Sequence, residues 1–175
     1  MRALVVYESM FGNTRTVAQA IAEGLATKLP VNTIEVGSAP TVLPADVEML
    51  IVGGPTHAHG LSTPRSRANA AERAGGPVVS TRVGLREWLG GLRAGTGVMA
   101  AAFDTRIKGP VLFTGSAATS ATRLLNRSRF RDVQPPRSFV LDGSTGPLVD
   151  RVPKDELDAA RAWGADLGSR LGPST

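Results

Sequence analysis

Short apolar runs alternate with helical patterns along the whole of this 175-residue chain. The opening residues, Arg2–Tyr7, form a continuous apolar run, which is typical of a strand buried on both faces of a sheet. Four later segments, of four to seven residues, are also apolar or, at Val31–Val36, show strand-like alternation. We therefore expect strands at Arg2–Tyr7, Val31–Val36, Val47–Val52, Gly97–Phe103 and Ser138–Leu141.

Between these runs, apolar residues recur at helical spacing. In the first such segment Val17, Ile21, Leu25 and Leu29 form one stripe, and Pro30 ends it. Helices are expected at Asn13–Leu29, within residues 81–92, at Ser116–Arg129 and at Asp155–Leu171. Strands separated by helices predict right-handed βαβ units, and therefore an α/β fold with a doubly wound parallel sheet and helices on both faces.

One stretch, residues 53–96, is longer than a simple crossover needs. Within it, residues 62–82 are rich in arginine, alanine and small polar residues. We interpret them as a mobile or inserted segment, with a helix from Pro64 to Ala74 as the alternative. No internal repeat and no interdomain linker is evident, so residues 1–175 are expected to form a single domain.

The amino-acid composition excludes several classes of function. The chain has no cysteine, which excludes disulfides, thiolate metal sites and cysteine nucleophiles, and its two histidines give little material for a metal site. It shows neither a leader pattern nor a membrane-spanning run, so a cytoplasmic protein without membrane contact is expected. The net charge of +5 is carried largely by arginine, but no nucleic-acid-binding motif accompanies it.

The segment after the first strand carries the clearest candidate chemistry. Ser9-Met10-Phe11-Gly12-Asn13-Thr14 joins a strand to a helix, where unpaired backbone N–H groups and the helix dipole favour an anion such as phosphate. The segment matches neither the Walker motif nor G-x-G-x-x-G. An ordinary helix N-cap at Asn13 or Thr14 is the alternative interpretation.

The same six residues resemble the phosphate loop of the flavodoxin family, written Ser/Thr-x-Thr-Gly-x-Thr. The order of strands and helices over the whole chain is also similar to that of flavodoxins. The resemblance implies a five-stranded sheet of order 2-1-3-4-5 and an FMN site at the carboxyl ends of the strands. It further implies FMN contacts from residues in three segments: Ser9, Met10, Phe11, Gly12, Asn13 and Thr14; Pro55, Thr56, His57, His59 and Gly60; and Phe103, Asp104, Thr105 and Arg106.

The sequence also departs from the family pattern. Phe11 stands where the motif has a threonine, and the expected flavin loops lack the usual tryptophan and tyrosine. We read Trp88, Trp163 and Tyr7 as packing residues. The loops instead offer neutral or positive neighbours, namely His57, His59, Arg106 and Lys108, which predicts a higher flavin reduction potential than acidic surroundings would give.

Three functions fit these residues. The favoured one is an FMN-binding redox protein that carries electrons between a reductase and an acceptor, with no assigned catalytic residue. The second is an FMN-dependent NAD(P)H:quinone-type oxidoreductase, and the third is a flavin-free binding or regulatory module. The redox partners and the oligomeric state are left open by the sequence.

Overall fold

The structure is a computed structural model, and it describes residues 1–57, 59–74, 77–93, 97–109, 115–128, 130–143 and 149–171. The helices within these ranges are α1 (Asn13–Ala26), α2 (Pro64–Ala74), α3 (Leu85–Gly91), α5 (Ala117–Asn126) and α6 (Lys154–Ser169). The strands are β1 (Arg2–Tyr7), β2 (Val31–Glu35), β3 (Val47–Pro55), β4 (Met99–Ile107), β5 (Asp132–Val133) and β6 (Arg137–Leu141). A short 3₁₀ turn, Val36–Ser38, follows β2.

All the described strand pairs are parallel, and the sheet has the order β2-β1-β3-β4-β5. Its fifth position is shared by two consecutive pieces of chain. β5 pairs with the start of β4, at Met99 and Ala100, and β6 pairs with β4 from Phe103 to Ile107. The expected parallel sheet of order 2-1-3-4-5 is therefore confirmed, with its last strand interrupted between Val133 and Arg137.

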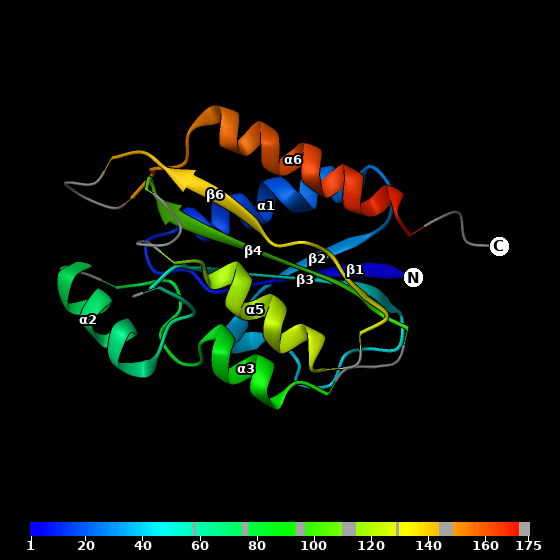
Figure 1. Ribbon diagram of the computed structural model, residues 1–175, viewed down its shortest axis with the longest axis horizontal. Coiled ribbons are helices and arrows are strands. Elements are labelled where there is room, and N and C mark those ends of the chain that lie inside the picture. The colour runs from blue at the N-terminus through cyan, green and yellow to red at the C-terminus, as the bar shows by residue number, and fades with distance from the viewer. Residues whose placement is uncertain are drawn as a thin grey trace.

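Helices cover both faces of the sheet (Figure 1), as the alternation of strands and helices predicts. Alternate residues of a strand point to opposite faces, so Leu4 and Val6 of β1 belong to one hydrophobic core and Ala3 and Val5 to the other. The first core includes buried residues of α3 and α5, and the second those of α1 and α6. Trp88 is buried in the first core, and Trp163 packs against the second, so both tryptophans are packing residues as expected.

β3 and β4 are longer at their carboxyl ends than the sequence predicts. β3 continues to Pro55 and β4 continues to Ile107, because Pro55 pairs with Thr105 and β6 supplies a second partner along β4. β4 thus continues through residues 104–107, beyond the expected strand end at Phe103. Asp104, Thr105 and Arg106 therefore take fixed strand positions, with side chains alternating between the two faces.

The long segment between β3 and β4 contains two helices. Residues 64–74 form α2, the helical alternative for this segment, and α3 follows at residues 85–91. In Figure 1, α2 lies to the side of α3 and α5, near the end of the sheet toward which β6 points. None of the helices in the described ranges is long and apolar enough to span a lipid bilayer.

Close contact between α1 and α6 depends on two glycines. A methyl group on Gly24 would overlap the carbonyl oxygen of Arg161, and one on Gly164 would overlap the carbonyl oxygen of Ile21. Around Gly90 of α3, in contrast, no atom of the described residues outside its own helix backbone lies within 4 Å of the position that a methyl group would take. The two helices on this face can approach only because both positions lack a side chain.

We therefore expect Gly164→Ala to lower the free energy of unfolding by about 1–3 kcal/mol, because the added methyl must push the two helix backbones apart. Gly90→Ala is the matched control: alanine has the higher helix propensity, and we expect it to raise the free energy of unfolding by up to about 1 kcal/mol. Urea denaturation at neutral pH measures both. Equal effects of the two substitutions would contradict the close-packing interpretation.

Candidate functional site

A cavity of about 830 Å³ opens at the carboxyl ends of β1, β3 and β4. This is the edge at which an open parallel sheet binds ligands, and the volume falls within the usual range for small-molecule sites. Most residues expected at the site line the cavity, namely Ser9, Met10, Phe11, Asn13, Thr14, Pro55, Thr56, His57, His59, Thr105 and Arg106. Gly12, Gly60, Phe103 and Asp104 do not line it.

The first wall of the cavity is the loop between β1 and α1. The Gly12 N–H donates to Ser9 Oγ at 3.1 Å and the Arg15 N–H donates to the same oxygen at 3.4 Å, so the loop folds around the serine hydroxyl. Gly12 has a φ of 93°, which favours glycine. The loop is also held to a neighbouring segment, because the Val79 N–H donates to the Met10 carbonyl oxygen.

This loop leaves backbone donors open at the start of α1. The N-cap of α1 is Gly12, and no side chain caps the helix. Within the part of the chain that the structure describes, the N–H groups of Met10, Phe11 and Thr14 have no hydrogen-bond acceptor. Open N–H groups beside the positive end of a helix dipole form a binding site for an anion.

The alternative of an ordinary N-cap at Asn13 or Thr14 is wrong, because both side chains are engaged elsewhere. Asn13 Oδ1 accepts a hydrogen bond from the Arg151 N–H at 2.9 Å. Thr14 Oγ1 shares a hydrogen bond of 2.7 Å with Thr105 Oγ1, which joins α1 to β4 across the sheet edge. The Thr14–Thr105 pair lies at the cavity wall, since both residues line it.

The second wall is the turn that follows β3. The backbone groups of His57 and Gly60 exchange two hydrogen bonds, of 2.8 and 2.9 Å, which close a tight turn. His59 within this turn has a φ of 77° and is exposed, whereas His57 is half-buried. Burial, and next the Arg67 guanidinium, lower the pKa of His57 below its ordinary value, so His57 is neutral at pH 7.

The third wall is the carboxyl end of β4, and here two expected site residues take other places. Phe103 is fully buried in the core, where its ring centroid lies 6.1 Å from that of Phe139 and 6.5 Å from that of Trp163. The expectation that Phe103 faces a cofactor is therefore corrected. Strand alternation turns it to the α1/α6 face, while Arg106 lines the cavity and donates to the Gly109 carbonyl oxygen at 2.7 Å.

Asp104 is also fully buried, and its carboxyl group organises the surrounding chain. Oδ2 accepts hydrogen bonds from Ser116 Oγ at 2.6 Å, from the Ala118 N–H at 2.9 Å and from Thr56 Oγ1 at 3.2 Å. The side chain therefore fixes the start of α5 and the orientation of Thr56, rather than bordering the cavity itself.

Sequence reasoning missed the fourth wall, which is a face of α2. Its lining residues are Ser66, Asn69, Ala70, Arg73 and Ala74. Their spacing of three and four residues places them on one side of the helix. Ile107, Leu141 and Val149 complete the lining. The signal for the start of α2 was present in the sequence: Thr63 and Ser66 cap each other's N–H groups, at 2.9 and 3.2 Å, and Pro64 stands at the first helical position.

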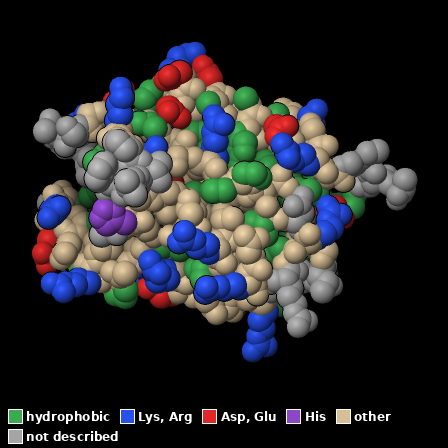
Figure 2. Space-filling view, in the orientation of Figure 1, with side chains coloured by type: hydrophobic (Ala, Val, Ile, Leu, Met, Phe, Trp, Pro, Cys, Tyr) green, Lys and Arg blue, Asp and Glu red, His purple; other side chains and the backbone are tan. Residues whose placement is uncertain are grey.

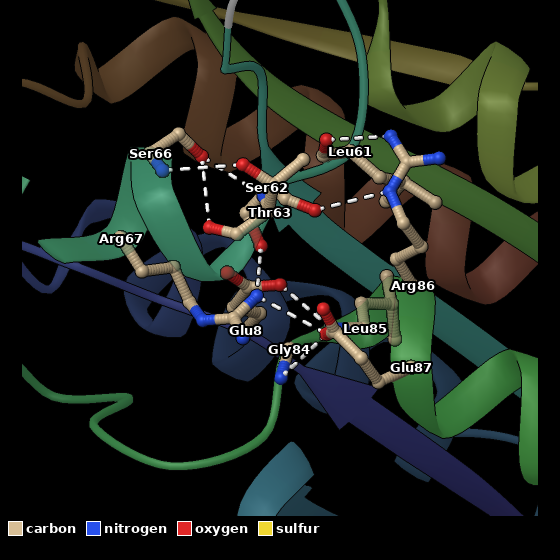
Figure 3. A network of polar contacts seen from close by, with 10 residues as sticks. All are labelled: Glu8, Leu61, Ser62, Thr63, Ser66, Arg67, Gly84, Leu85, Arg86 and Glu87. Atoms are coloured by element: carbon tan, nitrogen blue, oxygen red, sulfur yellow. Dashed lines mark hydrogen bonds and ion pairs between the residues drawn. The ribbon is translucent and has the colours of Figure 1, made fainter.

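A buried polar network holds α2 in place (Figure 3). Arg67 Nη1 donates to Ser62 Oγ at 2.9 Å and pairs with Glu87 Oε2 at 3.1 Å, although Arg67 is only 8% exposed. Arg86 of α3 donates to the carbonyl oxygens of Leu61 and Ser62. α2 is thus fixed to the start of α3 and to the chain that follows the second wall.

Glu8 lies at the base of this network, directly after β1. It is fully buried, and its Oε2 accepts a hydrogen bond of 2.7 Å from the Leu85 N–H at the start of α3. Burial raises the pKa of Glu8, and the Leu85 N–H, the Ser62 hydroxyl and the Arg67 charge only partly oppose this effect. The carboxyl group is therefore harder to ionise in the folded protein than in the unfolded chain.

Comparisons with known proteins agree with this architecture. No protein-family profile and no curated protein sequence matches the chain. Among solved structures, an archaeal flavodoxin superposes with a TM-score of 0.64 at 18% identity, over 99% of this chain and all of that one. Oxidised flavodoxin 1 from Bacillus cereus gives a TM-score of 0.64 at 15% identity, over 99% of this chain and 100% of that one.

A larger protein contains a similar unit. Rubredoxin oxygen:oxidoreductase from Desulfovibrio gigas superposes with a TM-score of 0.64 at 15% identity, over 97% of this chain and 36% of that protein. The sheet order and these superpositions show a flavodoxin-like fold, as the sequence resemblance implies.

The raised pKa of Glu8 predicts a pH-dependent stability difference. Below the ordinary glutamate pKa, Glu8 is protonated in both states. As pH rises, the unfolded chain ionises first, so the contribution of Glu8 to the free energy of unfolding declines until pH passes its folded-state pKa. Glu8→Gln removes this group while keeping an acceptor for the Leu85 N–H.

Urea denaturation of both proteins between pH 4 and pH 9, about the range in which a raised carboxyl pKa acts, measures the difference. We expect the free energy of unfolding of the wild type, relative to Glu8→Gln, to fall with rising pH. A difference that rises with pH or stays flat would show that Glu8 ionises freely in the fold. The two proteins share all other titrating groups, so the contributions of those groups to the pH dependence cancel in the difference.

Proposed function

We propose that the protein binds FMN and acts in electron transfer. The observation that carries this proposal is that two features lie in one cavity. They are the open N–H groups of Met10, Phe11 and Thr14 and the carboxyl ends of β3 and β4. The open N–H groups suit a phosphate. The strand ends form the walls of a crevice at the edge where a parallel sheet binds ligands, and a flat ring can lie between them.

The residues present fit the cofactor. The phosphate would lie against the loop at residues 9–14. With Thr105 Oγ1 donating in the Thr14–Thr105 hydrogen bond, the Thr14 hydroxyl would keep its own proton for the phosphate, beside the backbone N–H groups. The loss of a hydroxyl at Phe11 removes one donor only. The flavin ring would lie between the turn at Pro55–His59 and the end of β4, with Thr56, His57 and Arg106 as polar neighbours.

FMN supplies the capacity to accept and release electrons, and the chain supplies binding, orientation and charge. The Asp104 carboxyl group holds Thr56, and the Thr14–Thr105 hydrogen bond fixes the loop to β4, so the walls are ordered before a ligand enters. Neutral His57 and cationic Arg106 favour added negative charge on the flavin more than acidic neighbours would.

A redox partner protein is part of this proposal. Lys and Arg side chains are spread over the face of the molecule drawn in Figure 2, and the formal net charge is +5. Complementary charge guides protein encounters, so the favoured reductase or acceptor presents an acidic docking surface.

A second candidate function is an FMN-dependent oxidoreductase that takes hydride from NAD(P)H and reduces a quinone-type acceptor. The wall formed by α2 favours it, because Asn69 and Arg73 line the cavity outside the loop assigned to the phosphate. Oxidation of NADPH or NADH by the FMN-loaded protein, with and without a quinone, separates this enzyme from an electron carrier.

The primary test is a titration of free FMN with purified protein, followed by quenching of flavin fluorescence, with riboflavin as the control ligand. We expect tight binding of FMN and weaker binding of riboflavin, which lacks the phosphate. If neither flavin binds at micromolar concentration, the protein is a flavin-free module and the proposal is wrong.

The phosphate assignment predicts the effect of Thr14→Val, a substitution that keeps shape and removes the hydroxyl. We expect FMN affinity to fall about 10- to 150-fold, the loss of a hydrogen bond to a charged group, while riboflavin affinity changes little. The matched control is Thr27→Val, at the opposite end of α1. An equal loss for both flavins would indicate a disturbed fold rather than a lost phosphate contact.

The electrostatic assignment predicts that Arg106→Gln lowers the reduction potential of bound FMN, by roughly tens of millivolts, because a cation beside the ring is removed. Lys108→Gln is the control, because it also removes one positive charge but at an exposed residue that does not line the cavity. Spectroelectrochemical titration measures both variants. A rise in potential for Arg106→Gln would overturn the assignment.

A further inference from the structure

We infer that the face of α2 is a second binding region within the cavity, which accepts a small organic anion with a flat, apolar body beside the flavin. This inference rests on the proposed function and names the class of its small-molecule reaction partner. The observations that carry it are the composition of the α2 face, the charge of the whole cavity and an apolar rim.

The α2 face is separate from the phosphate loop and offers its own polar groups. Ser66, Asn69 and Arg73 line the cavity on one side of the helix, with Ala70 and Ala74 between them. Small alanine side chains leave room for a ligand against the helix surface. Arg73 forms no ion pair or hydrogen bond with any residue in the described ranges, so its guanidinium group is available to a ligand.

The cavity carries positive charge without acidic compensation. This charge comes from Arg73 and Arg106, and among the described residues that line the cavity there is no Asp or Glu. The residues outside the described ranges also include no Asp or Glu in the sequence, so they add no acidic side chain. One FMN phosphate is matched by the loop at residues 9–14, and Arg73 lies on a different wall.

The acidic side chains near the cavity either accept hydrogen bonds from protein groups or are exposed to solvent. Asp104, behind the wall, accepts three hydrogen bonds. Asp142 and Asp150 directly follow the lining residues Leu141 and Val149, but both are exposed, so water and salt screen them. The cavity therefore favours an anion over a neutral or cationic ligand.

The apolar rim of the cavity is the reason to expect a ligand with an apolar body. Ile107 is 43% exposed and Val149 is 53% exposed, and both line the cavity together with Leu141. Exposed large apolar side chains are common singly, but these two belong to the same cavity. An aromatic ring placed against them would be removed from water while its anionic group reaches Arg73.

The position of Arg73 is fixed by the opposite side of its helix. Arg67 is buried against Ser62 and Glu87, and the Thr63–Ser66 capping contacts fix the start of α2. A rotation of α2 would separate the buried Arg67 guanidinium from Ser62 and from the more exposed Glu87, and a buried charge without partners is costly. The helix therefore presents Asn69 and Arg73 to the cavity in a stable orientation, while the Ser66 hydroxyl is engaged with Thr63.

The test uses two redox-inert probes of the same shape, 2-naphthoate and 2-naphthamide, which differ in charge. Their dissociation constants for the FMN-loaded protein are measured by isothermal titration calorimetry at low and at moderate salt. We expect 2-naphthoate to bind about fivefold more tightly than 2-naphthamide, the effect of one partly exposed charge pair. In Arg73→Gln we expect this preference to fall below about twofold.

The matched control is Arg65→Gln, because Arg65 is an exposed arginine of the same helix that does not line the cavity. It should leave the preference for 2-naphthoate unchanged. Three results would overturn the inference: no binding of 2-naphthoate at millimolar concentration, equal affinity for the two probes, or the same loss in both arginine variants. The last would indicate a general surface charge effect.

The experiment separates this inference from the proposed function. FMN binding is measured first, and the naphthalene probes are then applied to the flavin-free protein as well. A protein that does not bind FMN but still prefers 2-naphthoate through Arg73 contradicts the electron-transfer proposal and supports the anion region. A protein that binds FMN without this preference supports electron transfer and contradicts the anion region.

Discussion

Two buried carboxyl groups fix the starts of α3 and α5 to the ends of the central strands. Glu8, after β1, accepts a hydrogen bond from the first N–H of α3, and Asp104, in β4, accepts one from the start of α5. Both groups lie where a helix has unpaired N–H donors, so each satisfies a group that would otherwise be buried without a partner. α2 depends on the same arrangement, because Arg67 joins it to Glu87 in the first turn of α3.

The sequence predicted the sheet well because buried parallel strands require continuous apolar runs. Arg2–Tyr7 has the predicted bounds, and the carboxyl ends of β1, β3 and β4 meet at one edge as the parallel topology requires. The errors lie at strand ends. The extension of β4 to Ile107 depends on pairing with β6, about thirty residues later in the chain, and a local pattern carries no information on such a partner. For this reason the sequence predicts Phe103 as the last residue of its strand and as a cofactor contact, whereas it is a core residue within β4.

The sequence offered α2 only as an alternative and did not predict that it forms a wall of the cavity, for a different reason. Helices are recognised by an apolar stripe, but only Arg67 and Ala70 of α2 are buried, and the face toward the cavity is small and polar. What orders this helix is a set of hydrogen bonds between distant residues. Glu8 and Leu85 are 77 positions apart, and Arg67 and Glu87 are 20 apart. Pairings of this kind follow from the folded topology and have no local signature.

Such buried polar groups stabilise a fold less than well-packed apolar residues of the same volume would. Their presence at Glu8, Arg67 and Asp104 therefore needs another reason, and the geometry of the cavity supplies one. Each of these groups orients a wall and none of them lines the cavity, so acidic charge is kept behind the surface while Arg73 and Arg106 stand in front. An apolar core in their place would hold the helices together without fixing which face of α2 meets the ligand. The selectivity for negative charge that we infer would thus depend on side chains that do not line the cavity.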